Sequence, residues 1–447
     1  MKSPASGIRR RVAAFVFGLI LALLLGELSL RWFVPAPSVT RVSAGLVHLS
    51  DDLALRYELT PFGTDGKVAI NGEGRRDFHY PQTKEPTVFR LALLGDSVTF
   101  AAAVPLAETF AKRLEYLLNR FQASPRIRFE VWNYAVPGYG IREEARCLES
   151  KVGRDRPDLV LLAYCLNDPD PFTIDLALLY QNLKAADKRR IGRLLGAPSD
   201  FGSVLVERSR LLQLVAPLFL PAGHRAAERQ ANEYIRGFWE ADRRSRESNR
   251  SRSYQEYVRV VTDRNWSAVE SGMRQLRSFA EANRIAAGVV IFPVLWHLPN
   301  YDLQPVHERV AAAAEKEGLP VLDLLRLFQD AAVRLRWPDE PPDPIHPDLA
   351  GNRLAGAGIA AWLVRRNLLP IREADMQSGF FELATVTAAA PPDWWNRYDM
   401  LWLEQAVRQA AAGRCREAQE SYAAAVNLNP AVQALRPAVN RCRPVAE

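Results

Sequence analysis

The sequence has few cysteines and few histidines, and its basic residues occur in scattered runs rather than in one basic stripe. Its four cysteines include no Cys-x-x-Cys pair, so we expect no zinc site, and nothing in the sequence calls for another metal or a cofactor. The net charge of +7 is modest for 447 residues and comes from scattered arginines, which argues against a nucleic-acid-binding function. With 48% hydrophobic and 24% charged residues, the composition is that of a globular protein rather than a disordered one.

The N-terminal segment has the features of a membrane anchor. Three arginines at 9–11 precede the apolar run 12–26. The uncharged part is short for a membrane span, but snorkelling of Arg31 would extend the helix to about residue 34. No small-x-small cleavage site is evident, so a retained signal anchor is favoured over a cleaved signal peptide. Because positive charge precedes the helix, we expect a cytoplasmic N-terminus and a periplasmic, or otherwise extracytoplasmic, body.

The remainder of the chain is predicted to form an irregular lead-in, an α/β domain and a helical end. The predicted boundaries are 1–35 for the tail and anchor, 36–87 for the lead-in, 88–370 for the α/β domain with a helical insertion at about 169–286, and 393–447 for a helical hairpin. The lead-in is rich in Gly, Pro and Asp. Its charged stretch 71–76 is expected to be a solvated turn without chemistry. The insertion exceeds what a compact sheet needs, which indicates a lid or an excursion.

The α/β domain alternates apolar strands with helices. The predicted strands are Phe89–Gly95, Arg128–Ala135, Asp158–Leu166, Ala286–Val294 and Leu319–Leu324. The predicted helices are Glu108–Phe121, Arg142–Val152, Ser267–Asn283, Gln304–Lys316 and Ala350–Arg366. Strands that are nearly continuous in Val, Leu and Ile are typical of a parallel sheet that is covered on both faces. We therefore predict a three-layer α/β/α sandwich of flavodoxin-like type.

The C-terminal segment 393–447 is helical and rich in alanine. Small and aromatic residues lie at the spacing of one tetratricopeptide unit: Trp402, Ala418, Tyr422, Ala425 and Pro430. Ala406 and Gln409 depart from the pattern. A single unit cannot bury its own faces, so we expect a hairpin docked on the main domain, with a protein contact as a further option. In an oxidising compartment, Cys415 and Cys442 are candidates for a disulfide.

Ser97 lies at a predicted turn between a strand and a helix. The apolar run 88–94 breaks at Gly95-Asp96-Ser97, and a helical pattern follows. A strand, a sharp turn and a helix lift one side chain to the carboxyl end of a sheet, where open α/β sheets bind ligands. The alternative is an ordinary turn in which Asp96 or Ser97 caps the helix.

Three further residues, Gly138, Asn167 and His346, lie just after a predicted strand or just before a predicted helix. Gly138 follows the second predicted strand and Asn167 follows the third, where a backbone N–H and a side-chain amide could bind an oxyanion. Each could instead be a turn residue. Of the six histidines, His346 alone has a carboxylate, Asp343, three residues upstream in a proline-rich loop. Such a loop can hold Asp343 against one ring nitrogen while the other faces a serine. The other histidines are expected at the surface or in packing.

Taken in order, these four motifs resemble the SGNH (GDSL-type) hydrolase family. The resemblance implies that Ser97 is the nucleophile, His346 the general base and Asp343 the residue that orients His346. It also implies an oxyanion hole formed by Ser97, Gly138 and Asn167. Cys165 occupies a position that is usually glycine, and Val98 one that is commonly leucine, which affects the expected substrate shape more than the catalysis.

The resemblance implies a serine esterase that acts on an acyl ester, such as an acetyl ester, of a glycan, a lipid or a small molecule, and the predicted N-terminal anchor would make it membrane-anchored. Two other functions stay open. The same site could serve an acyltransferase or deacetylase of envelope polysaccharide, which the predicted anchor favours. The domain could also be a non-catalytic scaffold whose C-terminal hairpin binds a partner.

Overall fold

The computed structural model describes residues 46–169, 250–331 and 343–435, with short gaps, and a few isolated residues before residue 46. The chain forms two compact units, residues 1–44 with 177–237 and residues 45–176 with 238–447. All elements described below belong to the second unit. The predicted anchor and most of the predicted insertion lie outside the described residues. Within the described ranges, no helix is both long enough and apolar enough to span a bilayer.

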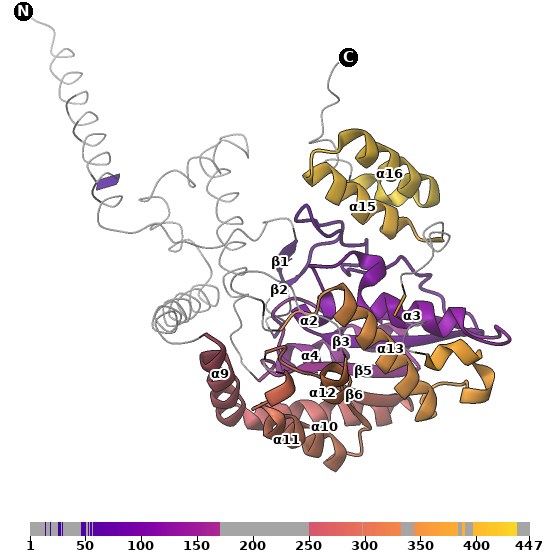
Figure 1. Ribbon diagram of the computed structural model, residues 1–447. Coiled ribbons are helices and arrows are strands. Elements are labelled where there is room, and N and C mark those ends of the chain that lie inside the picture. The colour runs from indigo at the N-terminus through magenta and orange to yellow at the C-terminus, as the bar shows by residue number, and fades with distance from the viewer. Residues whose placement is uncertain are drawn as a thin grey trace, which may run out of the picture. The chain divides into compact units, whose positions relative to one another are not determined.

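A five-stranded parallel sheet forms the centre of the second unit (Figure 1). Its order is β4-β3-β5-β6-β7, with bounds Arg128–Asn133, Val88–Gly95, Leu159–Cys165, Ala286–Phe292 and Val321–Asp323. Every neighbouring pair of strands is parallel. The predicted parallel α/β sheet is therefore confirmed, and each predicted strand overlaps one observed strand.

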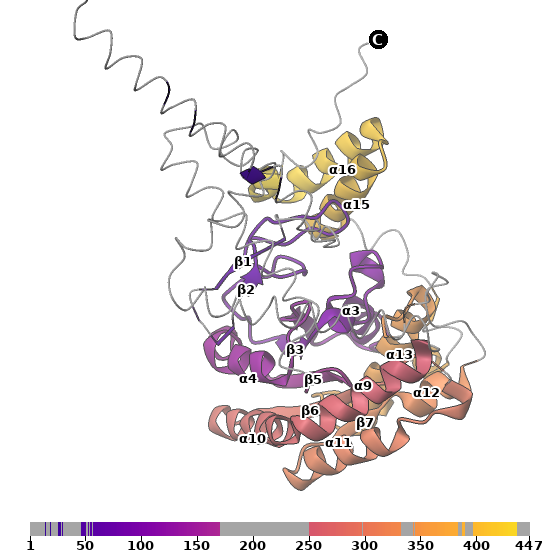
Figure 2. The ribbon, with the colours of Figure 1, turned by 90° about the vertical axis from the view of Figure 1, so that its left-hand side faces the viewer.

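Helices cover both faces of the sheet (Figure 2). One face carries α3 (Phe110–Arg120), α12 (Leu325–Asp330) and α13 (Leu349–Arg365). The other carries α4 (Ile141–Ser150), α10 (Trp266–Asn283) and α11 (Gln304–Lys316), and α9 (Arg250–Arg264) precedes α10. Short 3-10 turns lie at Leu106–Glu108, Val152–Asp155, Leu298–Asn300, Glu373–Asp375 and Ser378–Phe381.

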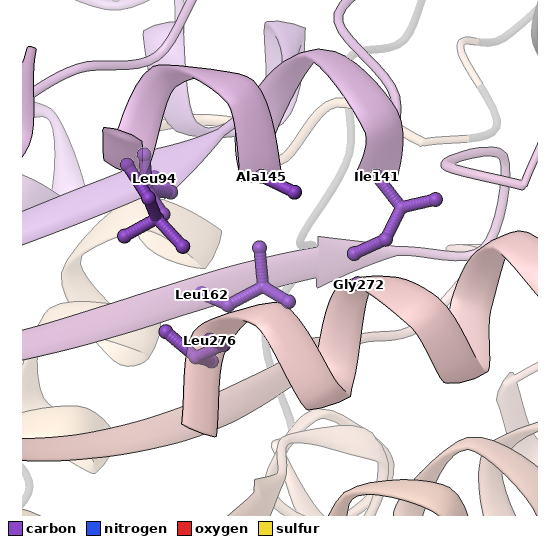
Figure 3. Close-up of a pocket in the computed structure, with 7 residues that line it drawn as sticks. Leu94, Ile141, Ala145, Leu162, Gly272 and Leu276 are labelled. Atoms are coloured by element: carbon purple, nitrogen blue, oxygen red, sulfur yellow. The ribbon is translucent and has the colours of Figure 1, made fainter. Parts of the chain in front are cut away.

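The alternation of side chains along β3 shows why its sequence is apolar throughout. Leu91 and Leu93 belong to the core cluster that includes α3 and α13, whereas Leu94 points to α4 and α10. Figure 3 shows Leu94 and Leu162 of the sheet facing Leu276 of α10 around a small hollow. The hollow is too narrow to hold a water molecule, so this region is packed core rather than a ligand site.

The lead-in contains structure that the sequence pattern does not reveal. The strands β1 (Val47–Leu49) and β2 (Tyr57–Leu59) form an antiparallel pair, too short for a periodic signal. The expectation of a solvated turn at 71–76 is wrong, because Asn71 and Arg76 are both buried. The Asn71 side chain organises the turn by accepting the Arg75 N–H at 2.9 Å and donating to the Phe78 carbonyl at 3.0 Å.

The C-terminal helices form a hairpin. The two helices are α15 (Asp399–Ala411) and α16 (Cys415–Leu428), and a 3-10 turn follows at Pro430–Leu435. Gly413, with φ +75°, takes the left-handed conformation in the turn between the helices. Ala406 and Ala418 are buried where the helices meet. Cys415 is disulfide-bonded, and Cys442, its candidate partner from the sequence, lies outside the described residues.

Candidate active site

Three predicted site residues follow three adjacent strands. β3 lies between β4 and β5, and all three run in the same direction. Ser97 follows β3, Gly138 follows β4 and Asn167 follows β5, so the three loops meet at one edge of the sheet. This edge, at the carboxyl ends of the strands, is where ligands bind in open α/β sheets.

Ser97 opens the one-turn helix α2 (Ser97–Phe100). The Asp96 carboxylate caps this helix by accepting the Val98 N–H at 2.8 Å. Gly95 is required just before the turn, because a Cβ there would lie 2.2 Å from the Thr99 Oγ1 atom. The helix ends at Ala101, which has the left-handed φ of 53°. The serine is thus held on a very short helix that is fixed at its start by a buried carboxylate.

His346 and Asp343 are joined to Ser97 by hydrogen bonds. The Nε2 atom of His346 lies 2.9 Å from the Ser97 Oγ, and its Nδ1 atom lies 2.7 Å from the Asp343 Oδ2. The other carboxylate oxygen of Asp343 accepts the backbone N–H groups of Ile345 at 2.9 Å and His346 at 3.0 Å. The structure therefore brings together the serine, histidine and aspartate that the sequence analysis selected.

The electrostatics of Asp343 select one tautomer of His346. Burial raises the pKa of the Asp343 carboxyl, but the hydrogen bonds and charge of His346 and the Ile345 N–H outweigh burial, so its pKa is lowered overall. An ionised Asp343 accepts a hydrogen bond from the Nδ1–H group. The Nε2 atom is then unprotonated and accepts the hydrogen bond of the Ser97 hydroxyl. This is the arrangement in which a histidine can remove a proton from a serine.

The Gly138 and Asn167 loops are tied to the same site. Gly138 has the left-handed φ of +80°, and the Asn167 side-chain amide donates to the Asp96 carboxylate at 3.2 Å. The Ile141 N–H donates to the Asp168 carbonyl at 3.0 Å, which joins the two loops.

Tyr57 of the lead-in and Tyr139 of the Gly138 loop join these two segments, a link that the sequence analysis missed. The Tyr57 hydroxyl donates to the Pro137 carbonyl at 2.7 Å, and the Tyr139 hydroxyl donates to the Tyr57 carbonyl at 2.6 Å. Both tyrosines are buried. No sequence signal links them, because Tyr57 lies on a three-residue strand far from the loop.

The family of the chain follows from its sequence. Residues 93–354, more than half of the chain, match the model of the GDSL-like lipase/acylhydrolase family. The chain belongs to this family. The predicted membership is therefore confirmed, and the chain is an ester-hydrolysing enzyme. No curated protein matches the sequence of this GDSL-like enzyme.

Several solved structures resemble this GDSL-like enzyme at low sequence identity. TesA is 14% identical and covers 63% of this chain and 99% of its own, with a TM-score of 0.33. The acetylxylan esterase Axe2 from Geobacillus stearothermophilus is 15% identical in sequence. The match covers 64% of this chain and 97% of the Axe2 chain, with a TM-score of 0.32. A two-domain esterase active on acetylated mannans is 13% identical in sequence. The match covers 64% of this chain and 52% of the esterase chain, with a TM-score of 0.34.

Cys165 departs from the usual family pattern without adding a reactive group. It is free and buried at the end of β5. Burial, followed by the negative charges of Asp96 and Asp168, raises the pKa of its thiol well above the ordinary value. The thiol therefore stays protonated and packs as a small apolar side chain.

Buried carboxyl groups lie beside the site of this GDSL-like enzyme, and the sequence analysis missed them. Burial, followed by the neighbouring charges of Asp96 and Glu143, raises the pKa of Glu144 well above its usual range. Burial and the charge of Glu144 do the same for the pKa of Asp168. Neither Glu144 oxygen has a hydrogen-bond partner among the described residues. Burial without a hydrogen-bond partner disfavours the ionised form of Glu144, so its carboxyl holds a proton more tightly than an exposed carboxyl does.

A second histidine is held by a carboxylate and a hydroxyl. The ring of His307 is fully buried, with Nδ1 2.8 Å from the Asp323 Oδ1 and Nε2 2.9 Å from the Tyr301 hydroxyl oxygen. The Tyr301 oxygen also accepts the Val294 N–H at 2.9 Å. Both ring nitrogens are paired, so this group fastens the ends of β6 and β7, in line with the expected packing role.

Within the described ranges, no group of three or more His, Cys, Asp and Glu side chains is arranged to hold a metal ion.

Proposed function

We propose that this enzyme hydrolyses an acyl ester by a Ser-His-Asp mechanism in which Ser97 is the nucleophile. The observation that carries the proposal is the continuous chain of hydrogen bonds from the Ser97 hydroxyl through the His346 ring to the Asp343 carboxylate. A serine at its ordinary pKa is a weak nucleophile and needs an adjacent base of this kind.

In the acylation step, the Ser97 Oγ attacks the ester carbonyl carbon while His346 Nε2 takes the hydroxyl proton. The imidazolium that forms is stabilised by the ionised Asp343 at 2.7 Å. When the tetrahedral intermediate collapses, Nε2 returns the proton to the leaving alcohol oxygen, and the acyl group stays on Ser97. In the deacylation step, His346 activates a water molecule that releases the acid and restores Ser97.

The charge on the tetrahedral oxygen needs hydrogen-bond donors. We assign this task to the backbone N–H groups of Ser97 and Gly138 and to the side-chain amide of Asn167. Asp96 accepts one of the two amide hydrogens of Asn167 and thereby fixes the orientation of the amide. The second hydrogen remains available for the oxyanion. The loss of one such donor typically costs about 3 kcal/mol of transition-state stabilisation.

The proposed location is the outer face of a membrane, with residues 1–35 as a single-pass anchor and the N-terminus in the cytoplasm. The support is the arginine cluster at 9–11 followed by the apolar run 12–26. Protease treatment of intact spheroplasts tests this proposal. Digestion of the catalytic domain in intact spheroplasts is expected, and protection until lysis would contradict it.

Purified enzyme and p-nitrophenyl esters of increasing acyl length test the chemistry. Ser97→Ala is expected to lower kcat at least about 10⁴-fold and Asn167→Ala about 10²- to 10³-fold. Ser150→Ala is a suitable control, because the Ser150 hydroxyl donates to the Arg146 carbonyl at 2.9 Å within α4. Full activity in Ser97→Ala would rule out the mechanism. Adding acetylated and free oligosaccharides then separates hydrolysis from transfer: a transferase would yield an acylated glycan in place of free acid.

A further inference from the structure

The helix that carries Ser97 is too short to be stable by itself. α2 has one turn, and its last backbone carbonyls have no partners within the helix. Its first turn is fixed by Asp96, as described above. The Ala101 N–H donates to the Ser97 carbonyl at 2.9 Å, so Ala101 closes the turn that Ser97 begins. Ala101 does so in the left-handed conformation, which is unfavourable for a residue other than glycine.

The Arg76 guanidinium binds the carboxyl end of this helix. One of its terminal nitrogens donates to the carbonyls of Phe100 at 2.7 Å and Ala101 at 2.5 Å. The other donates to the Val104 carbonyl at 2.7 Å. A cation that binds the last carbonyls of a helix satisfies polar groups that the helix leaves open and interacts favourably with its dipole. Arg76 is therefore a cap for the turn that carries Ser97.

Glu404 of α15 supplies the counter-charge of Arg76. Arg76 is 1% exposed and Glu404 2% exposed, so both charges are out of contact with water. They form a bidentate pair, with Nε to Oε2 at 3.0 Å and Nη2 to Oε1 at 2.7 Å. The Glu404 Oε1 atom also accepts the Leu106 N–H at 2.8 Å. Without Glu404, Arg76 would be an unpaired buried charge, which proteins rarely tolerate.

Further side-chain contacts hold the hairpin on the same region. Arg408, one turn beyond Glu404, donates to the Val104 carbonyl at 2.9 Å. The ring of Tyr398, just before α15, stacks on Phe78 with a centroid distance of 3.8 Å. The segment 100–106, which includes the end of α2, thus receives hydrogen bonds from both Arg76 and α15.

We propose that the C-terminal hairpin positions the nucleophile. In this role Glu404 holds Arg76, and Arg76 holds the end of the one-turn helix on which Ser97 lies. Both are positioning residues, because neither touches the reacting atoms. The inference depends on the proposed function only in taking Ser97 as the nucleophile. It makes the hairpin part of the catalytic domain's working structure rather than a separate binding module.

The test compares turnover with stability in four variants. Glu404→Gln, Arg76→Met and the double variant Arg76→Met/Glu404→Leu remove the pair in different ways. Ser421→Ala is the control, because the Ser421 hydroxyl donates to Gln409 at 2.8 Å inside the hairpin and does not contact the segment 100–106. For each variant, kcat and KM for a p-nitrophenyl ester are measured at a temperature at which urea unfolding shows the protein to be fully folded.

We expect kcat to fall about tenfold or more in all three pair variants, with KM little changed, since small displacements of a reacting group are costly. The double variant should be less destabilised than Glu404→Gln, because it leaves no buried Arg76 charge without a carboxylate. In Arg76→Met, Glu404 keeps Arg408 as an ion-pair partner at 3.3 Å. Across these variants, the loss of kcat should therefore not follow the loss of unfolding stability. Ser421→Ala should lower stability and keep kcat. Wild-type kcat in a folded double variant would overturn the inference, as would an equal loss of kcat in Ser421→Ala.

Hydrogen exchange separates this inference from the proposed function. The amides of residues 98–106 should exchange faster in Glu404→Gln than in wild type, and at the wild-type rate in Ser421→Ala. This difference is expected even if the wild-type enzyme hydrolyses no ester, in which case only the proposed function fails. Unchanged exchange of this segment in both Glu404→Gln and the double variant would contradict the inference whatever the activity.

Discussion

Asp343 accepts three hydrogen bonds from a segment that ends only three residues beyond it, and two of them come from His346. The His346 ring lies 2.7 Å from one carboxylate oxygen, and the His346 N–H lies 3.0 Å from the other, which also accepts the Ile345 N–H at 2.9 Å. The backbone of the loop therefore holds one oxygen of the carboxylate while the His346 ring bonds the other. The general base His346 and the carboxylate that orients it thus lie in one short segment of the chain, which fixes their relative positions.

Replacing Asp343 by asparagine tests the orientation of the base. The amide oxygen of the new side chain can still accept the two backbone N–H groups, so the loop should keep its shape. The amide nitrogen, however, would favour the tautomer of His346 in which Nε2 carries the proton and cannot accept from Ser97. We expect kcat to fall about 10³- to 10⁴-fold, far more than the modest loss of stability from removing the ionised carboxyl would explain. A loss of less than tenfold in ester hydrolysis would contradict the role of Asp343.

The lowered pKa of Asp343 also predicts how stability depends on pH. The folded-state pKa lies below the unfolded value of about 3.9, so the ionised carboxyl contributes stability above about pH 4 and loses it as the pH falls through the folded-state pKa. The stability difference between wild type and Asp343→Asn should therefore shrink from pH 6 to pH 3. Urea unfolding of both proteins across this range measures it. A difference that is independent of pH would show that the carboxyl does not ionise differently on folding.

Glu144 should have the opposite dependence. Its raised folded-state pKa means that the folded protein holds a proton that the unfolded chain loses above about pH 4.3, so wild-type stability falls as the pH rises. Glu144→Gln removes this effect. Its stability relative to wild type, measured by urea unfolding, should increase from pH 4 to pH 8, by up to about 1.4 kcal/mol per pH unit.

Glu149→Gln is the matched control for this prediction, since Glu149 lies on the same helix with a side chain that is 56% exposed. It should change stability little at any pH. If Glu144→Gln and Glu149→Gln gave the same profile, a raised pKa of the Glu144 carboxyl in the folded protein would be ruled out.

Gly95→Ala should disturb the turn that carries Ser97. The new methyl group would overlap the Thr99 side chain at 2.2 Å, and relief of the overlap costs about 1–3 kcal/mol and shifts α2. We expect lower stability and a lower kcat. Gly153→Ala is the control, because its methyl group would meet nothing closer than 3.4 Å, an atom of the Phe279 ring. Equal effects of the two substitutions in unfolding and in ester hydrolysis would contradict the close approach at Gly95.

The features that the sequence predicts are those with local signals. Strands buried on both faces are apolar throughout, so the parallel sheet could be predicted, and a proline-rich loop with a carboxylate before His346 pointed to the base. Arg76 could not be found in this way. It lies in a turn rich in glycine and charge that looks solvated, and its partner Glu404 is 328 residues further along the chain.

Glu144 escaped prediction for a similar reason. It follows Glu143 at the start of a helix, where acidic residues are usually exposed and favourable. Its burial depends on packing that no local pattern describes. Tyr57 and Tyr139 likewise meet only because a three-residue strand lies against the Gly138 loop. Pairings of this kind depend on tertiary structure, and the charges involved look ordinary in the sequence.

The most direct test of the proposed mechanism is labelling with a fluorophosphonate probe, which reacts with activated serines. It should be applied to wild type, Ser97→Ala and His346→Ala, each shown to be folded by its unfolding transition. The Ser-His-Asp mechanism predicts labelling of wild type at Ser97, no labelling of Ser97→Ala and strongly slowed labelling of His346→Ala. Folded wild type that does not react, or Ser97→Ala that reacts as fast as wild type, would contradict it.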